Sequence, residues 1–231
     1  MLNLTAAEAE IKKADFDLWK LLKSVGSAGS ALTDLSQGFA AFKLGVSYFD
    51  GYVSGSSAKS PETVSVVSAL IAHSVVLFVR ATGERSSHRN SIQFATKRGS
   101  EFHERAERVR RLRSNAIAHY GPGHEGLSRP WNSFSVLLNL QTSDIESASQ
   151  QLSIEPQLVE DLNILFPAAI VEIGAIVEAR SLDLKDYLVN LPSTSAAIPI
   201  MMRYPFDEQH YDDTVSTPVE PQPLSSILRR S

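Results

Sequence analysis

The sequence predicts an all-α protein built as a helical bundle, and two observations support this. Apolar residues recur at helical spacing in five segments with clear start or stop signals, whereas only one segment alternates as a strand does. Of the 231 residues, 43% are hydrophobic and 21% are charged, so the core is large enough to fold without disulfides or metal. The five helices are expected at residues 5–23, 32–50, 61–82, 99–120 and 154–181.

The first three helices have recognisable ends. Thr5 and Glu8 form a capping box at the start of the first helix, and the Ser- and Gly-rich segment 24–30 is expected to break the chain before the second. The third helix opens with Ser60 as N-cap and Pro61 at the first helical position. Because this helix is strongly apolar, we expect it at the centre of the bundle.

The second half of the helical region is more varied. The fourth helix is basic and is expected to stop at the Gly-Pro-Gly sequence 121–123. Residues 133–141 alternate, which predicts a short strand or hairpin arm. Pro167 is expected to interrupt the fifth helix, and a short helix is expected at 184–191. Together these elements predict one helical domain over residues 1–191.

Residues 192–231 differ in composition from the rest of the chain. They contain six prolines, few large apolar residues and two acidic pairs, which predicts a flexible tail. The segment 224–230 combines two leucines and an isoleucine with two arginines. This segment is either a docking peptide or a solvated terminus.

Composition and motifs exclude several classes of protein. Cysteine is absent, which rules out a disulfide scaffold, a zinc ribbon and a thiol nucleophile. No apolar run reaches the roughly 18 residues of a membrane span, and the first residues lack the pattern of a signal peptide, so we expect a cytoplasmic protein without a membrane partner. The histidines lack metal-ligand spacing and no glycine-rich phosphate loop occurs, so neither a metal nor a cofactor is expected. His73, inside the apolar third helix, is expected to be a hydrogen-bonded core residue.

Charge is distributed unevenly along the chain. The formal net charge is −4, yet the segment from Arg85 to Arg113 has nine basic and three acidic residues. A dense basic segment in an acidic chain is typical of a site for an anion such as RNA, or of a face that docks an acidic partner. The arginines of this segment can also have a structural role, because three acid–base pairs have the four-residue spacing that stabilises a helix. These pairs are Glu101–Arg105, Glu104–Arg108 and Glu107–Arg111. Arg98, Arg110 and Arg113 have no partner at that spacing.

The end of the basic helix carries the residues best suited to chemistry. Asn115 and His119 are four residues apart, so on a helix the amide can hydrogen-bond the imidazole and fix its tautomer. Arg113 lies six residues before His119, about 9 Å along a helix and roughly 120° around it. Metal-free cleavage of a phosphodiester needs a fixed cation to stabilise developing negative charge and an imidazole to move protons. Arg113 and His119 supply both groups, although an Arg and a His at a helix end are also compatible with a structural role.

The segment Arg113-Ser-Asn-Ala-Ile-Ala-His119-Tyr120 resembles the signature of HEPN domains, in which an arginine and a polar residue precede a histidine by four to six intervening positions. Five positions intervene here. The resemblance implies a bundle of four to five helices that dimerises, with the Arg–His pairs of two chains lining one cleft. Many members are metal-independent ribonucleases of toxin–antitoxin or antiviral-defence systems. A homodimer, an RNA substrate and an inhibitory protein partner are therefore implied.

The resemblance also implies roles for individual residues. His119 would act as acid or base or orient the ribose 2′-hydroxyl, and Arg113 would stabilise the phosphorane-like transition state. Ser114 or Asn115 would be the supporting polar residue, and Tyr120 directly follows the histidine. The products would be a 2′,3′-cyclic phosphate and a 5′-hydroxyl. An alignment anchored on Asn115 and His119 instead puts the family's arginine position on Ser114.

Two arginines outside the signature are further candidates for binding RNA. Arg110 lies on the basic helix and has no acidic partner at four-residue spacing. Arg80 closes the apolar third helix, and a dimer would bring this helix end to the same cleft. The alternative for Arg80 is an ion pair at the end of its helix.

Three functions are consistent with the sequence. The leading hypothesis is a metal-independent endoribonuclease of a toxin or antiviral-defence type, which cleaves RNA by attack of the 2′-hydroxyl. The alternative is a non-catalytic, HEPN-like scaffold that binds RNA or protein. A DNA-binding helical protein is a third hypothesis, against which stands the lack of a helix-turn-helix pattern near the basic segment.

Overall fold

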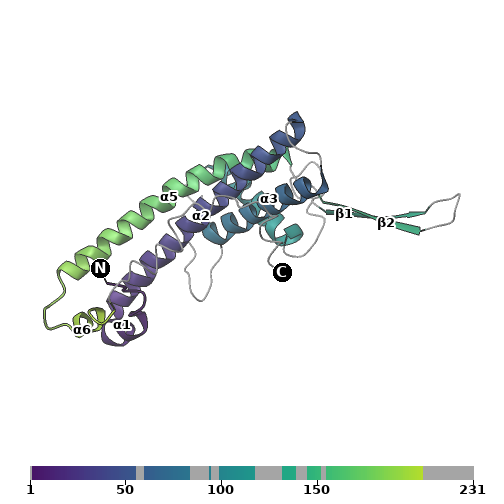
Figure 1. Ribbon diagram of the computed structural model, residues 1–231. Helices are drawn as coiled ribbons and strands as arrows, with labels where there is room; N and C mark the ends of the chain where they lie inside the picture. Colours follow the sequence, from purple (N-terminus) through teal and green to yellow (C-terminus); the bar gives the residue numbers. More distant parts are fainter. Residues whose placement is uncertain are drawn as a thin grey trace. The chain divides into compact units, whose positions relative to one another are not determined.

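The structure, a computed structural model, describes residues 2–55, 60–83, 94, 99–117, 132–138, 145–151 and 155–204 (Figure 1). Over these residues the fold is all-α, as the sequence predicts, with six α-helices, one π-helical turn and a two-stranded hairpin. The chain divides into two compact units. The terminal unit combines Met1–Leu22 with Asp186–Ser231, and the central unit is Lys23–Lys185.

Two short helices pack together in the terminal unit. They are α1 (Glu8–Ala14) and α6 (Ala197–Met201). The unit also contains the first turns of α2 (Phe16–Ser54) and the last residues of α5 (Pro156–Val189). Among the described residues of this unit, the buried side chains are all apolar: Ala7, Ile11, Leu18, Ala197 and Met201.

The helix predicted at residues 5–23 is divided at Asp15. This residue is extended, with φ −151° and ψ 96°, and its carboxylate accepts hydrogen bonds from Leu18 N at 2.9 Å and from the Tyr187 hydroxyl at 3.0 Å. An aspartate that accepts from the backbone N–H three residues later is an N-cap, so Asp15 ends α1 and starts α2. The predicted capping box is also wrong, because α1 begins only at Glu8 and lacks a side-chain cap.

The first residues of the predicted tail belong to the terminal unit. Residues 192–204 are described and include α6. Arg203 and the Tyr204 hydroxyl both donate to the Glu10 carboxylate, and Asn3 N donates to Tyr204 O at 2.7 Å. This part of the tail is therefore packed against the start of the chain, and residues 205–231 lie outside the described residues.

Helix α2 runs without interruption through the segment predicted to break it. Gly26 and Gly29 both lie inside this 39-residue helix. Three residues beside or after these glycines on α2 are fully buried in the core: Ala28, Ala31 and Leu35. Helix propensity is a weak prior that tertiary packing overrides, so burial of this face keeps the Ser- and Gly-rich segment helical.

Helix α5 also continues where the sequence predicts an interruption. It spans 34 residues with Pro167 inside it. It also joins the two helices that were predicted separately at residues 154–181 and 184–191. Proline removes one helical hydrogen bond, but the residues around it, Leu165, Phe166 and Ala169, are fully buried. Packing of an apolar face supplies most helical stability in proteins, and here it outweighs the lost bond.

Helix α3 (Pro61–Thr82) is central, as predicted. Ser60 accepts a hydrogen bond from Thr63 N and Pro61 follows at the first helical position. The core that α3 shares with α2 and α5 centres on Phe166, whose ring lies 5.4 Å from that of Phe78 and 5.6 Å from that of Phe39. The expectation for His73 is wrong, because this side chain is exposed.

The predicted hairpin arm is present. Strands β1 (Asn132–Leu138) and β2 (Ile145–Gln151) pair antiparallel, with Leu138 opposite Ile145. Leu138 is 57% exposed and Ile145 is 74% exposed, so this pair exposes apolar surface to solvent.

Two helices are long and apolar enough to cross a membrane by length and composition alone. They are α3 over Glu62–Thr82, half of whose most apolar window is buried, and α5, with 28% of that window buried. Core helices of soluble proteins have the same composition, and the burial of α3 fits such a helix. A large part of the apolar surface of α5 is not covered by the chain itself.

Candidate functional site

The signature segment forms a turn of unusual geometry at the end of the basic helix. Helix α4 (Ser100–Leu112) passes directly into the π-helical turn η1 (Arg113–Ile117). Arg113 and Ser114 are half-buried and Asn115 is exposed. His119 and Tyr120 lie outside the described residues, so the geometry of the Arg113–His119 pair stays a prediction.

Burial on both sides of η1 explains the wider turn. Leu112 is buried in the core, and Ile117 packs against the same core five residues later. An α-helix repeats its face after three or four residues, whereas a π-helix bonds residue i to residue i+5. The turn must widen for both side chains to contact the core. The α-helix predicted to residue 120 is therefore wrong over Arg113–Ile117, where the turn is π-helical, and residues 118–120 lie outside the described residues.

Arg80 forms an ion pair at the end of its helix, which was the alternative to a role in RNA binding. Its Nε donates to Asp34 Oδ2 at 2.8 Å, and its Nη2 donates to Asp34 Oδ1. Asp34, on α2, is 4% exposed, while the Arg80 side chain is 49% exposed. The pair therefore fastens the last turn of α3 to α2 and occupies the guanidinium edge that would bind a phosphate.

Arg110 has no acidic partner at four-residue spacing, as the sequence predicts, but it has one at three-residue spacing. It forms an ion pair with Glu107, three residues earlier on α4. A side chain added at Gly83, the C-cap of α3, would meet Arg110 Nε at 3.1 Å. The guanidinium thus lies at the carbonyl end of α3, where the helix dipole favours a positive charge. The structure brings Arg110 and the end of α3 together, and it gives Arg110 a role in packing.

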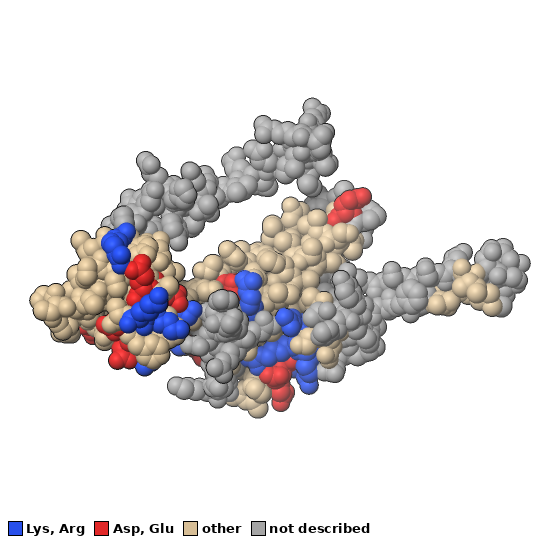
Figure 2. Space-filling view, turned by 90° about the horizontal axis from the view of Figure 1, so that it is seen from below, with Lys and Arg blue, Asp and Glu red and all other residues tan. Residues whose placement is uncertain are grey.

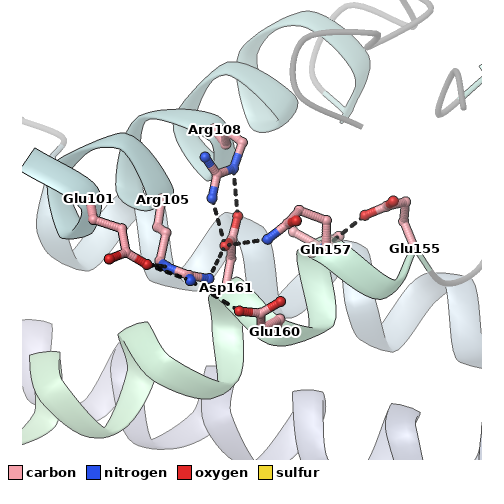
Figure 3. A network of polar contacts seen from close by, with 8 residues as sticks. Glu101, Arg105, Arg108, Glu155, Gln157, Glu160 and Asp161 are labelled. Carbon is pink, nitrogen blue, oxygen red and sulfur yellow. Dashed lines mark hydrogen bonds and ion pairs between the residues drawn. The ribbon is translucent and has the colours of Figure 1, made fainter. Parts of the chain in front are cut away.

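Two further arginines of α4 converge on one buried carboxylate (Figure 3). Arg108 donates to both oxygens of Asp161, each at 2.8 Å, and Arg105 Nη1 donates to Oδ1 at 2.8 Å. Asp161 lies on α5 and is 1% exposed. Gln157 completes the set with a hydrogen bond of 3.2 Å to Oδ1.

The expected helix pairs are only partly formed. Arg105 binds Glu101 at 2.8 Å, as its four-residue spacing predicts, and it also binds Glu160 at 3.0 Å. Arg108, however, is directed to Asp161, and Glu107 binds Arg110. Arg105 is only 13% exposed and its partner Asp161 is buried, whereas Glu101 and Glu160 are exposed, so its contacts extend from the surface of the helix to a buried carboxylate.

This network raises the pKa of both arginines. The hydrogen bonds to Asp161 raise the pKa of Arg108, and those to Glu101 first, then to Glu160 and Asp161, raise the pKa of Arg105. Arginine is already charged at every accessible pH, so these two side chains are fixed cations. They can hold a carboxylate in place but cannot transfer protons.

Asp161 was missed by sequence reasoning. The sequence feature that could have found it is a carboxylate on an apolar helix face. Helical spacing puts residue 161 on the same face as Leu158 and Leu165, which are both buried. Buried charges are paired or bind metals, so a charged residue at a core position predicts a partner. The sequence does not identify that partner, which lies more than 50 positions away.

The surface of the described chain mixes both charges. Figure 2 shows the blue atoms of Lys and Arg directly beside the red atoms of Asp and Glu on this face, and no uninterrupted blue area. In the described part of the basic segment, residues 99–113, the charges of Arg105, Arg108 and Arg110 are thus offset by their acidic partners. Among the residues that the structure describes, no group of three or more His, Asp or Glu side chains could hold a metal ion.

Comparison with known proteins identifies no relative of the chain. No family model, no curated protein and no solved structure matches the chain.

Proposed function

We propose that the chain is a HEPN-like, metal-independent endoribonuclease of a toxin or antiviral-defence type whose active residues are Arg113 and His119. The observation that carries the proposal is the π-helical turn over Arg113–Ile117. π-helical turns are rare and occur frequently at functional sites, and this one coincides with the segment that resembles the HEPN signature. Arg113 and Asn115 lie on this turn with partly or fully exposed side chains.

The chemistry follows from the residue types. The ribose 2′-hydroxyl attacks the adjacent phosphorus, the bond from phosphorus to the 5′-oxygen breaks, and that oxygen takes up a proton. His119 removes or delivers the proton, or orients the hydroxyl. Arg113 stabilises the extra negative charge on the phosphorane-like transition state, and Ser114 or Asn115 supports the pair. The products are a 2′,3′-cyclic phosphate and a 5′-hydroxyl.

The arginine contacts favour a second candidate function, a non-catalytic scaffold that binds RNA or protein. Arg80, Arg105, Arg108 and Arg110 all bind carboxylates of their own chain. Their charge is therefore used in the fold, which leaves fewer groups for phosphate binding. In the scaffold hypothesis, the π-helical turn and the exposed Asn115 would form a binding surface without reaction.

Cleavage of a labelled single-stranded RNA in excess EDTA, at stated ionic strength, distinguishes the two. The ribonuclease hypothesis predicts product with a cyclic phosphate end and a loss of about 100-fold or more in His119→Ala and in Arg113→Ala. Arg111→Ala is the matched control, because Arg111 is exposed on the same segment but lies outside the signature. RNA binding without cleavage would support the scaffold, and equal cleavage by all variants would refute the assigned site.

We also propose that the chain forms a homodimer, supported by the uncovered face of α5. Val171 is 71% exposed and Leu182 is 54% exposed. With 100° per residue, Val171 and Leu182 lie within about 45° of the direction opposite to the buried face. Charged residues such as Glu160 and Glu178 share this side, so its apolar surface is confined to the positions around Val171 and Leu182. Light scattering should give twice the chain mass, and Val171→Glu should reduce it toward that of one chain, whereas a single-chain mass for the unmodified protein would refute the dimer.

A further inference from the structure

We propose that Asp161 is a positioning residue: by binding Arg105 and Arg108 it sets the register of α4 against α5 and thereby the place of η1. The consequence for RNA cleavage rests on the proposed function, whereas the effect on register does not. All the residues involved lie in the central unit. We call Arg105, Arg108 and Asp161 the clamp.

The geometry of the clamp is directional. Arg108 Nε and Nη2 each contact a different oxygen of Asp161, both at 2.8 Å, which is the two-pronged arrangement with the strictest orientation among ion pairs. Arg105, one turn earlier, approaches Oδ1 from the same helix. Figure 3 shows both guanidinium groups reaching from α4 to the single carboxylate on α5. One carboxylate therefore fixes two points on α4.

Apolar packing alone defines the register of α4 weakly. The helix has 13 residues with three buried side chains, Ala106, Val109 and Leu112, and the half-buried Phe102 also packs against the core. Hydrophobic burial is non-directional. A slip of one residue would move α4 by about 1.5 Å and turn it by about 100°, and Arg108 would then point away from Asp161. The slip would therefore break the directional hydrogen bonds of the clamp.

Burial adds to this effect. With the arginines in place Asp161 is 1% exposed, so its charge is compensated by the two guanidinium groups and not by water. A buried ion pair is weak evidence for stability, because an apolar group of the same shape is often as good, and its best-attested role is to fix register. The clamp therefore has the properties expected of a register-setting contact.

Register at the clamp determines the position of η1. Arg113 follows Arg108 by five residues on a continuous helical backbone, and Ile117 packs against the core at the far end of the turn. The π-helical turn therefore lies between two fixed points, the clamp and Ile117. If the first point is released, Arg113 and Asn115 lose their defined place.

Arg108→Lys is the most informative variant. It keeps the positive charge, and with it the attraction to RNA, but a lysine has no two-pronged donor. Arg111→Lys is the matched control, because it makes the same change at an exposed position on the same helix. Hydrogen exchange of the amides at 109–117 should be about tenfold faster in Arg108→Lys, with no change in α3 and none in Arg111→Lys. Unchanged exchange at 109–117, or equal acceleration in all helices, would overturn the proposal.

Activity gives a separate readout. Arg108→Lys should lower kcat by about tenfold and leave KM for RNA within about threefold, because charge is kept and geometry is lost. Asp161→Asn should act in the same direction and Asp161→Glu should restore part of kcat. If the unmodified protein cleaves no RNA, the proposed function fails, while the exchange experiment still decides whether the clamp sets the register. Normal kcat in Arg108→Lys and Asp161→Asn would overturn the positioning role.

Discussion

Leu112 and Ile117 contact the same core although they are five residues apart, and the π-helical turn between them makes this possible. The wider turn shifts the helical phase by one residue relative to an α-helix. Arg113, Ser114 and Asn115 therefore project in directions that an α-helix would not give them. The geometry of the candidate site depends on this apolar contact as well as on its polar residues.

Replacement of Ile117 by alanine should loosen the turn. Its side chain is half-buried against the core, so the expected loss in the free energy of unfolding is about 1–2 kcal/mol, below the value for a fully buried isoleucine. Urea unfolding measures the loss. Val53→Ala, at a site 62% exposed on α2, should change stability by less than about 0.5 kcal/mol. Equal effects of the two substitutions would show that Ile117 does not anchor the turn.

Two glycines of α2 should respond to alanine in opposite ways. A Cβ at Gly38 would lie 3.0 Å from Leu77 Cβ and from two ring atoms of Phe166, so Gly38→Ala should destabilise by about 1–3 kcal/mol through overpacking. A Cβ at Gly29 would meet nothing within 4 Å. Gly29→Ala should stabilise by about 0.5–1 kcal/mol, since glycine is a poor helix former. Chemical denaturation of both variants is the measurement, and a stabilising Gly38→Ala would contradict the close packing of α2, α3 and α5.

Replacement of Arg80 by alanine should lower the free energy of unfolding and should not act primarily on RNA binding. Arg80→Ala leaves the carboxylate of Asp34 buried without its bidentate partner. Breaking a fully buried pair costs roughly 3–5 kcal/mol, and we expect about 2 kcal/mol here because half of the Arg80 side chain is exposed. Denaturant unfolding of Arg80→Ala measures this loss, with Arg111→Ala as the control variant. If Arg80→Ala instead weakens RNA binding and leaves stability unchanged, the structural role is wrong and Arg80 belongs to the RNA-binding surface.

The sequence predicted those parts of the fold that depend on local patterns. The N-cap Ser60 and the apolar run after it placed α3 correctly, and the alternation after residue 133 indicated the hairpin. Errors arose where distant contacts decide the outcome. Pro167 and the glycines of α2 are helix breakers by propensity, but buried neighbours on other helices keep both segments helical.

The same reasoning explains the results for the candidate site. Spacing along one helix correctly predicted the pair of Glu101 and Arg105, because both residues lie on α4. It could not predict Asp161 or Asp34 as arginine partners, since those carboxylates come from helices far away in the sequence. The π-helical turn was missed for a related reason. A one-residue shift of phase is set by what Ile117 contacts, and no local motif encodes it.

The contact of Glu10 with Tyr204 should make the packing of residues 198–204 dependent on pH. The hydrogen bond from the Tyr204 hydroxyl, followed by the charge of Arg203, holds the pKa of Glu10 below its ordinary value. A carboxyl group whose pKa is lowered by folding stabilises the fold above its unfolded pKa and loses this effect as the pH falls through the folded pKa. The packing should therefore be complete above about pH 4.3 and weaken below it.

Hydrogen exchange of residues 198–204 between pH 3 and pH 6 measures this, after correction for the intrinsic pH dependence of exchange. Glu10→Gln should remove the acid-induced opening of this segment, because an amide does not titrate in that range. Tyr204→Phe removes the largest cause of the lowered pKa but keeps Arg203, so its opening should begin at a higher pH than in the unmodified protein. The same opening curve in all three proteins would show that another carboxylate controls this contact, since only Glu10 binds both Arg203 and Tyr204 among the residues that the structure describes.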